Sequence, residues 1–122
     1  MAYMNQEMKK TIAVAMKPVL KKYGVKATLS VENLSTIHLN IKSSKFDFMK
    51  QAGYDGKYMT VNPYSYERDF SGECLEFLKE AHNVLLGAGW YNNSDSQSDY
   101  FDIAYYYYVN VGRWNTPYEM VK

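Results

Sequence analysis

The sequence is poor in the residues that support disulfides, zinc sites and membrane spans: among 122 residues it has one cysteine and two histidines. With Cys74 as its only cysteine the chain cannot form an internal disulfide, and we expect Cys74 to be a small buried hydrophobic residue. His38 and His82 add too few ligands for a zinc cluster. No stretch approaches the roughly 20 apolar residues of a membrane helix, and the first residues lack the apolar run of a signal peptide. We therefore expect an intracellular protein that uses no membrane.

Patterns for catalysis and cofactor binding are also missing. The sequence has no glycine loop of the P-loop or dinucleotide-binding type, and Ser71-Gly72 lacks the spacing of a nucleophile elbow. Neither histidine has a neighbouring nucleophile or carboxylate in a pattern typical of catalysis. We expect no enzymatic activity, no catalytic residue and no cofactor, although an active site assembled in space leaves no local trace.

One loop invites a metal interpretation. Asp95, Asp99 and Asp102 supply oxygen ligands close together, as calcium loops do. However, no glycine lies inside the loop, no glutamate closes it, and Asp99 and Asp102 would point to opposite faces of a strand. We expect a hydrogen-bonded turn and no metal.

Charges of the two signs are separated along the chain. The formal net charge is +1, but residues 1–61 carry +6 and residues 62–122 carry −5. Such a split indicates internal pairing, self-association or two opposed patches. It argues against a general nucleic-acid binder, because such a domain is normally basic overall.

Helical periodicity appears twice. Residues 5–22 have one apolar stripe and a lysine-rich outer face, with Gly24 as the C-cap and Pro18 as a site of kinking or of a break near Lys17. Residues 71–86 form a second helix with an acidic outer face, for which Asp69 or Ser71 is the N-cap.

Strand-like alternation fills most of the rest. Residues 26–32 and 36–42 predict a hairpin with a turn at Asn33-Leu34, residues 58–62 predict a third strand, and residues 101–111 predict a tyrosine-rich fourth. The order α-β-β-β-α-β predicts one domain over residues 1–122. Its class is α+β, with two helices packed on one face of a mainly antiparallel four-stranded sheet.

The tyrosine-rich strand is the most informative segment. Period two places Tyr105, Tyr107 and Val109 in the core and Tyr106, Tyr108 and Asn110 on the opposite face. Solvated sheet faces usually carry Thr, Lys and Glu, so this face is a candidate binding surface, although tyrosines also fill half-buried sheets because of their β propensity. The predicted binding residues are Tyr106, Tyr108, His38, Asn40, Tyr58, Arg113 and Trp114. Arg113 and Trp114 are residue types enriched at interface hot spots, and tryptophans also cap the ends of a core.

Several segments in the last two thirds of the chain resemble small uncharacterised proteins of tailed phages and mobile elements. They are Val61-Asn-Pro-Tyr64, Tyr91-Asn-Asn-Ser-Asp95, Ser98-Asp-Tyr-Phe-Asp102, Val111-Gly-Arg-Trp114 and Pro117-Tyr118. The resemblance implies an accessory protein in the cytoplasm of an infected bacterium, with no site residues to carry over.

Three functions remain open at this point. The first is a non-enzymatic protein that binds a host or phage protein complex, such as an anti-CRISPR-like inhibitor of host defence. The second is a single-stranded nucleic-acid-binding module that stacks bases on Tyr106 and Tyr108. The third is a homodimer formed through the tyrosine face. A double-stranded RNA-binding domain shares the α-β-β-β-α order, but its second helix begins with basic residues, where this chain has Asp69, Glu73 and Glu76.

Overall fold

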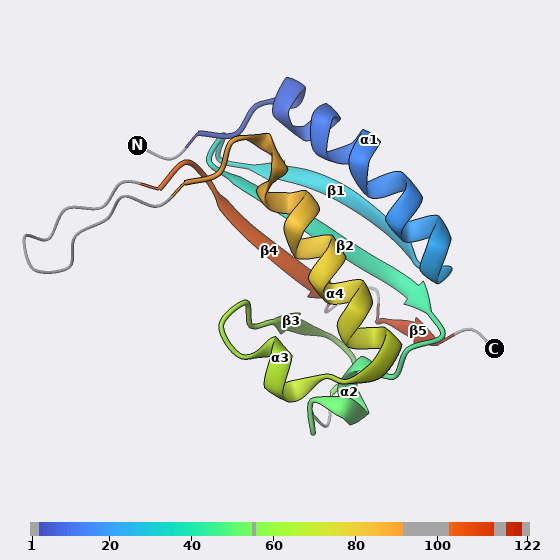
Figure 1. Cartoon of the computed structure of the whole chain (residues 1–122). Helices are drawn as coiled ribbons and strands as arrows, with labels where there is room; N and C mark the ends of the chain where they lie inside the picture. The colour runs from blue at the N-terminus through green and yellow to red at the C-terminus, as the bar shows by residue number, and fades with distance from the viewer. Residues whose placement is uncertain (1–2, 55, 92–102, 114–116, 121–122) are drawn as a thin grey trace, which may run out of the picture.

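Two long helices lie side by side across one face of a β-sheet in the computed structural model, which describes residues 3–54, 56–91, 103–113 and 117–120 (Figure 1). This two-layer arrangement confirms the expected α+β class with both long helices on one face. The opposite face of the sheet, called here the open face, carries or borders those candidate binding residues that the structure describes.

Helix α1 (Gln6–Tyr23) has clear sequence signals at both ends. The Asn5 side chain accepts a hydrogen bond from the Met8 amide, and Gly24 closes the helix in the left-handed conformation. Of the two alternatives for Pro18, a kink or a break near Lys17, the break is absent, since α1 continues through Pro18. Pro18 is exposed, so water can solvate the carbonyl that loses its intrahelical donor.

Helix α4 (Gly72–Leu85) begins after Ser71 and is followed by a short 3₁₀ turn, η1 (Leu86–Ala88). It packs against α1 and buries one apolar stripe. The buried residues of α4 are Cys74, Phe77, Leu78, Ala81, His82 and Leu85. Two one-turn helices, α2 (Phe48–Gln51) and α3 (Tyr66–Asp69), lie in the connection between the hairpin and α4.

The sheet contains five described strands: β1 (Lys26–Glu32), β2 (Thr36–Ser44), β3 (Met59–Val61), β4 (Tyr106–Val111) and β5 (Glu119–Met120). Their spatial order is β1-β2-β4-β3, and β5 pairs with the end of β2. The β1–β2 hairpin and the third strand are confirmed. Asn33 and Leu34, both with positive φ, begin the hairpin turn as expected.

Two details of the expected sheet are wrong. The described sheet has five strands rather than four, and it is mixed because β2 runs parallel to both β4 and β5. Helix α4 carries the chain back along the sheet, so β4 starts at the same end as β2 (Figure 1). The two strands therefore run in the same direction, as parallel neighbours joined by a long crossover connection do.

Alternation along β2 and β4 separates the core from the open face as predicted. Ile37, Leu39 and Ile41 of β2 are at most 1% exposed, and so are Val109 and Val111 of β4. Tyr105, just before β4, is fully buried and donates a hydrogen bond to the Leu85 carbonyl at 2.5 Å.

Some lysines of the basic first half of the chain form ion pairs with glutamates of the acidic second half. Lys22 Nζ of α1 lies 3.3 Å from Glu80 Oε2 of α4, and Lys45 Nζ lies 2.5 Å from Glu73 Oε1. The hydroxyl of Tyr23 also donates to Glu80, and this hydrogen bond, with Lys22, lowers the pKa of Glu80. Internal pairing between the two helices is thus one of the expected explanations that the structure supports.

Candidate functional site

The register of the sheet brings the predicted residues together on the open face. Tyr108 pairs with His38 across β4 and β2, and Asn110 pairs with Asn40 in the same two strands. Thr60 of β3 pairs with Asn110 from the other side. Residues far apart in the sequence therefore form adjacent rows on one surface, as the period-two pattern predicts.

A chain of side-chain hydrogen bonds, called here the polar ladder, crosses all four strands of the main sheet path. Asn40 Nδ2 donates to Ser30 Oγ at 3.0 Å, Asn110 Nδ2 donates to Asn40 Oδ1 at 3.1 Å, and Thr60 Oγ1 donates to Asn110 Oδ1 at 3.0 Å. Because every step links neighbouring strands, the ladder holds the open face in one arrangement.

His38 joins the ladder to the tyrosines. Its Nδ1 accepts from Asn110 Nδ2 at 3.0 Å, which leaves Nε2 as the proton-bearing atom that donates to Glu32 Oε1 at 3.0 Å. Its ring stacks on Tyr108 with a centroid separation of 5.3 Å. The ladder thus fixes the imidazole, and the imidazole supports the Tyr108 ring.

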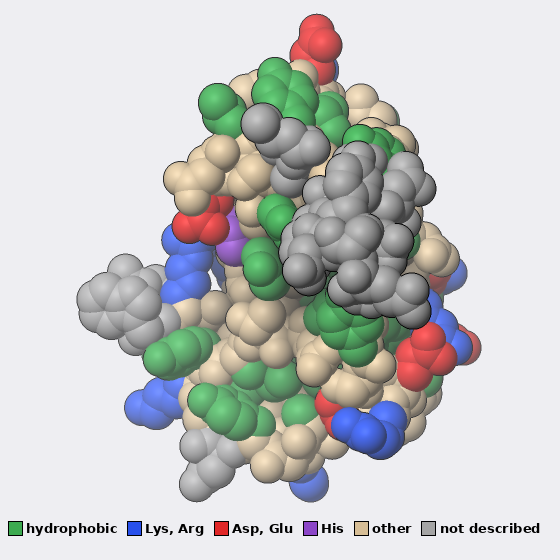
Figure 2. Space-filling model, turned by 90° about the vertical axis from the view of Figure 1, so that its left-hand side faces the viewer, with side chains coloured by type: hydrophobic (Ala, Val, Ile, Leu, Met, Phe, Trp, Pro, Cys, Tyr) green, Lys and Arg blue, Asp and Glu red, His purple; other side chains and the backbone are tan. Residues whose placement is uncertain are grey.

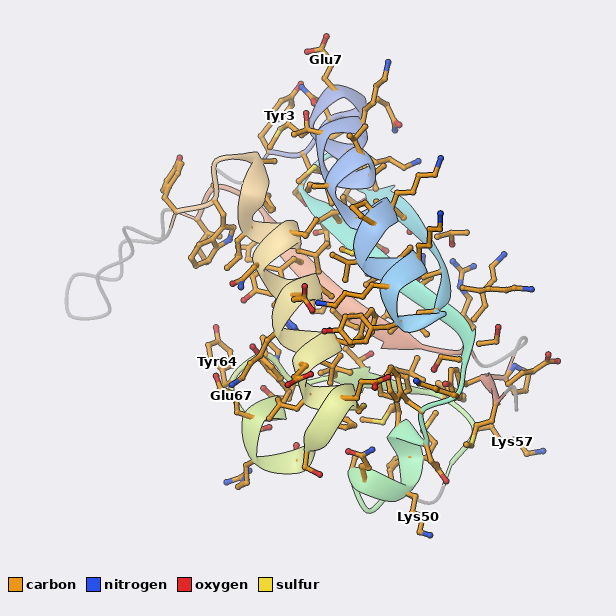
Figure 3. All side chains as sticks on the ribbon, turned by 45° about the vertical axis from the view of Figure 1, so that its right-hand side comes forward. Tyr3, Glu7, Lys50, Lys57, Tyr64 and Glu67 are labelled. Atoms are coloured by element: carbon orange, nitrogen blue, oxygen red, sulfur yellow. The ribbon has the colours of Figure 1, made fainter. Side chains whose placement is uncertain are left out.

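The tyrosines beside the ladder are partly exposed. Tyr106 is 44% exposed and Tyr108 is 42% exposed. They line a groove of about 390 Å³ at the edge of β4, beyond the last residue that pairs with β3. Tyr64, labelled in Figure 3, is 95% exposed and lines the same groove together with Trp90. Figure 2 views this side of the molecule and shows several clusters of hydrophobic side chains at the surface.

Arg113 and Tyr58 occupy the other end of the open face. They border a hollow of about 320 Å³ whose lining also includes Asn40, Asn110 and Gly112. Gly112 has a φ of +74°, and a Cβ there would lie 2.5 Å from the Tyr118 amide nitrogen. The glycine therefore allows the chain near Tyr118 to pass close to the end of β4.

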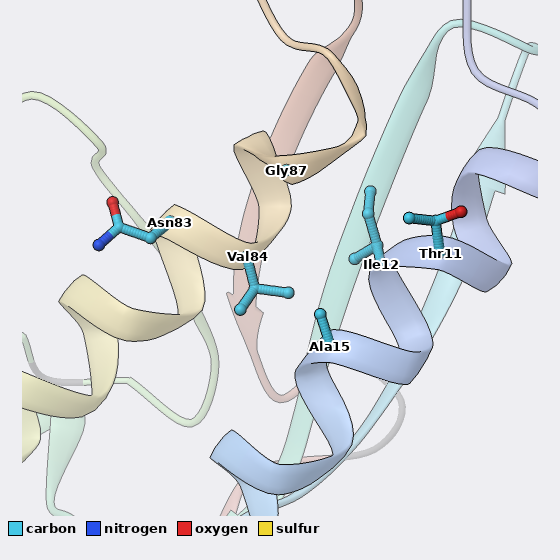
Figure 4. Close-up of a pocket in the computed structure, with 6 residues that line it drawn as sticks. All are labelled: Thr11, Ile12, Ala15, Asn83, Val84 and Gly87. Carbon is cyan, nitrogen blue, oxygen red and sulfur yellow. The ribbon is translucent and has the colours of Figure 1, made fainter.

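Another hollow lies between the two long helices (Figure 4). It is lined by Thr11, Ile12, Ala15, Asn83, Val84 and Gly87. Its surface is almost entirely apolar and has no titratable group, so it offers no chemistry beyond apolar contact. The open face is the better candidate site because it combines aromatic, polar and charged groups.

Two side chains that could in principle react, Cys74 and His82, are buried in the core. Cys74 is 2% exposed, and burial raises the pKa of its thiol to about 12, so it is not a thiolate near neutral pH. His82 is 5% exposed, donates from Nδ1 to the Leu78 carbonyl at 2.6 Å and stacks on Tyr66. Burial lowers the pKa of His82, so its ring is neutral near neutral pH.

Six of the seven predicted binding residues lie on the open face or line its hollows, and Trp114 lies outside the described residues. The aspartate loop with Asp95, Asp99 and Asp102 lies outside them too. Sequence reasoning placed Asn110 on the open face but missed that it is the branch point of the ladder, and it overlooked the contribution of Glu32. The alternation with Tyr106 and Tyr108 was the available signal for Asn110.

In comparisons with protein-family models, with curated proteins and with solved structures, no match to this chain is found. In the described part of the chain, no helix has the length and apolar character needed to cross a bilayer. The same residues contain no cluster of three or more His, Cys, Asp or Glu side chains placed to hold a metal ion.

Proposed function

We propose that this chain is a non-enzymatic binding protein that docks another protein through the tyrosine end of its open face. The observation that carries the proposal is the pair of exposed tyrosines, Tyr106 and Tyr108, next to a rigid polar ladder. Tyrosine gives a large contact area at low entropic cost, and aromatic residues are enriched in interface cores. Fixing the neighbouring polar groups before binding also reduces the ordering cost of association.

The resemblance to small proteins of tailed phages supplies the biological setting of the proposal. We place the protein in the cytoplasm of an infected or element-bearing bacterium, where it binds a host complex and inhibits a defence system in the manner of an anti-CRISPR protein. Support comes from the size of the chain, the phage-like segments and the burial of Cys74 and His82.

Affinity capture tests the binding function. Tagged wild-type protein is compared with the double variant Tyr106→Ala and Tyr108→Ala, and with Tyr54→Ala as a matched control. Tyr54 is 50% exposed and follows α2, away from the groove. We expect wild type and the control to retain one host complex after nuclease treatment, and the double variant to lose it. Retention by all three proteins, or by none, would overturn the proposal.

Growth of phage on defended hosts tests the inhibitor role separately. Deleting the gene should reduce plaque formation on hosts that carry the targeted defence system and leave it unchanged on hosts that lack it. Equal growth on both would remove the inhibitor role, while the binding function would still be judged by capture.

A second candidate is a single-stranded nucleic-acid binder. The stacked His38–Tyr108 pair on a sheet face, with Arg113 on the same surface, favours it, because bases stack on such platforms. It predicts capture that is lost after nuclease treatment and that weakens steeply with salt.

A further inference from the structure

On the open face the exposed tyrosine pair, Tyr106 and Tyr108, is separated from the cations Lys42 and Arg113. Tyr106 and Tyr108 occupy the first rows of β4, whereas Arg113 follows its end and Lys42 lies in the adjacent strand β2. The amide of Gly112 donates to the Ile41 carbonyl at 2.9 Å, which places Lys42 and Arg113 next to this junction. From Tyr108 to Gly112 the strand advances by about 13 Å.

The cations at this end are available to a partner. Lys42 and Arg113 are exposed, and in the described part of the chain neither forms an ion pair. Glu119, which pairs with Ser43, is the acidic residue that the register brings nearest to them. A second described carboxylate on this face, Glu32, is engaged by His38 at the opposite end. Among the residues that the structure describes, the end near Arg113 is therefore net basic.

We infer that the protein partner places an acidic segment in the hollow bordered by Tyr58 and Arg113 while its apolar part contacts Tyr106 and Tyr108. The inference rests on the proposed function and specifies the partner's chemistry. A guanidinium at the rim can hold a carboxylate in a two-point contact, and Tyr58 supplies an aromatic wall for the rest of the side chain. Lys42 adds a second positive charge to the same end.

The separation of the groups favours a protein over a nucleic acid. A single strand carries a phosphate beside every base, so its binding track needs cations interleaved with the stacking residues. Here Tyr108 stacks on His38, which is bonded to the carboxylate of Glu32, and Lys42 and Arg113 lie about 13 Å further along the strand. A protein segment with an apolar part and a separate acidic part matches this arrangement.

Selection from a library of random displayed peptides tests the inference on the full-length protein at low salt. We expect the enriched peptides to combine aromatic or aliphatic residues with aspartate or glutamate. A chosen peptide should bind the double variant Lys42→Glu and Arg113→Glu at least about tenfold more weakly than wild type. The control is Lys10→Glu and Lys17→Glu, which reverses two exposed charges on α1 and should leave the affinity unchanged.

Enriched peptides without acidic residues, no enrichment, or equal binding by the reversed variant would overturn the inference. An oligothymidylate probe is titrated in parallel, and tighter binding of this probe than of the selected peptide would also overturn it. The proposed function is judged independently. If host capture depends on Tyr106 and Tyr108 but is unaffected by Lys42→Glu and Arg113→Glu, the binding function stands and the acidic segment is excluded.

Discussion

His38 lies over Tyr108 with its ring plane inclined by 21° and its centroid 5.3 Å away, while its two nitrogens are both engaged by hydrogen bonds. The exposed tyrosine is thus supported by a residue whose orientation is set by Asn110 and Glu32. This relationship connects the polar ladder to the surface that we propose for binding. A substitution that breaks the polar ladder should therefore also alter the orientation of Tyr108 at the proposed binding surface.

Asn110 is the residue at which this coupling can be tested. Its side chain bonds to His38, Asn40 and Thr60, so Asn110→Ala leaves buried Asn40 without one partner. We expect a loss of about 1–3 kcal/mol in the free energy of unfolding, measured by urea denaturation. The control, Thr60→Ala, removes one exposed bond and should cost less than about 1 kcal/mol. Equal losses in the two variants would contradict a branch point at Asn110.

Gly112 and Gly53 form a matched pair for testing close backbone approach. Both have positive φ, +74° and +68°, but a Cβ at Gly53 meets nothing within 4 Å whereas one at Gly112 meets the Tyr118 backbone. Gly53→Ala should cost about 1–2 kcal/mol for the left-handed conformation alone. Gly112→Ala should cost about 1–3 kcal/mol more because the backbone near Tyr118 must move. Similar unfolding free energies for the two variants would refute the close approach.

Cys74 should be unreactive in the folded protein. Its thiol is buried and its pKa is about 12, so a disulfide reagent at pH near 8 should modify it only when the chain opens. The control protein carries Cys74→Ala with Val14→Cys, which moves the thiol to a site that is 69% exposed and should react at once. Fast modification of native wild type, followed spectroscopically, would show that the thiol is accessible.

Much of the fold could be predicted from the sequence because the relevant signals are local. The apolar stripe of α1, the hairpin turn at Asn33 and the alternation that buries Val109 and exposes Tyr108 each depend on residues close in sequence. The exposure of Pro18 explains why this proline does not end α1. A proline on the outer side of a helix loses one hydrogen bond but does not disturb the packing of the inner side.

The parallel pairing of β2 with β4 and the short strand β5 could not be predicted in this way. They depend on where α4 returns the chain and on how the segment around Tyr118 packs against Ser44 and Phe48. For the candidate site, residue type and periodicity indicated which side chains share the open face. The hydrogen bonds of Asn110 required the register between strands, which no local pattern contains.

His82 provides a prediction about pH. Burial lowers its pKa below the ordinary value of 6.5, while the unfolded chain retains the ordinary value. Between the two values the unfolded state binds more protons than the folded state, so folding stability falls as pH decreases through this window. The folding stability that depends on neutral His82 is fully present above the pKa of the unfolded chain. It is lost as the pH falls toward the lower pKa of His82 in the folded protein.

The test compares wild type with His82→Phe by urea unfolding from pH 7.5 down to about pH 5.5, a range above most carboxylate titrations. Phenylalanine keeps a ring beside Tyr66 and Tyr107 but cannot be protonated. Wild type should therefore lose more unfolding free energy over this range than His82→Phe does, whatever their difference at pH 7.5. His38, half-buried and paired with Glu32, is present in both proteins, so it does not create a difference between them. Parallel pH profiles would mean that His82 is not held neutral by burial, and that the aromatic cluster around it admits solvent.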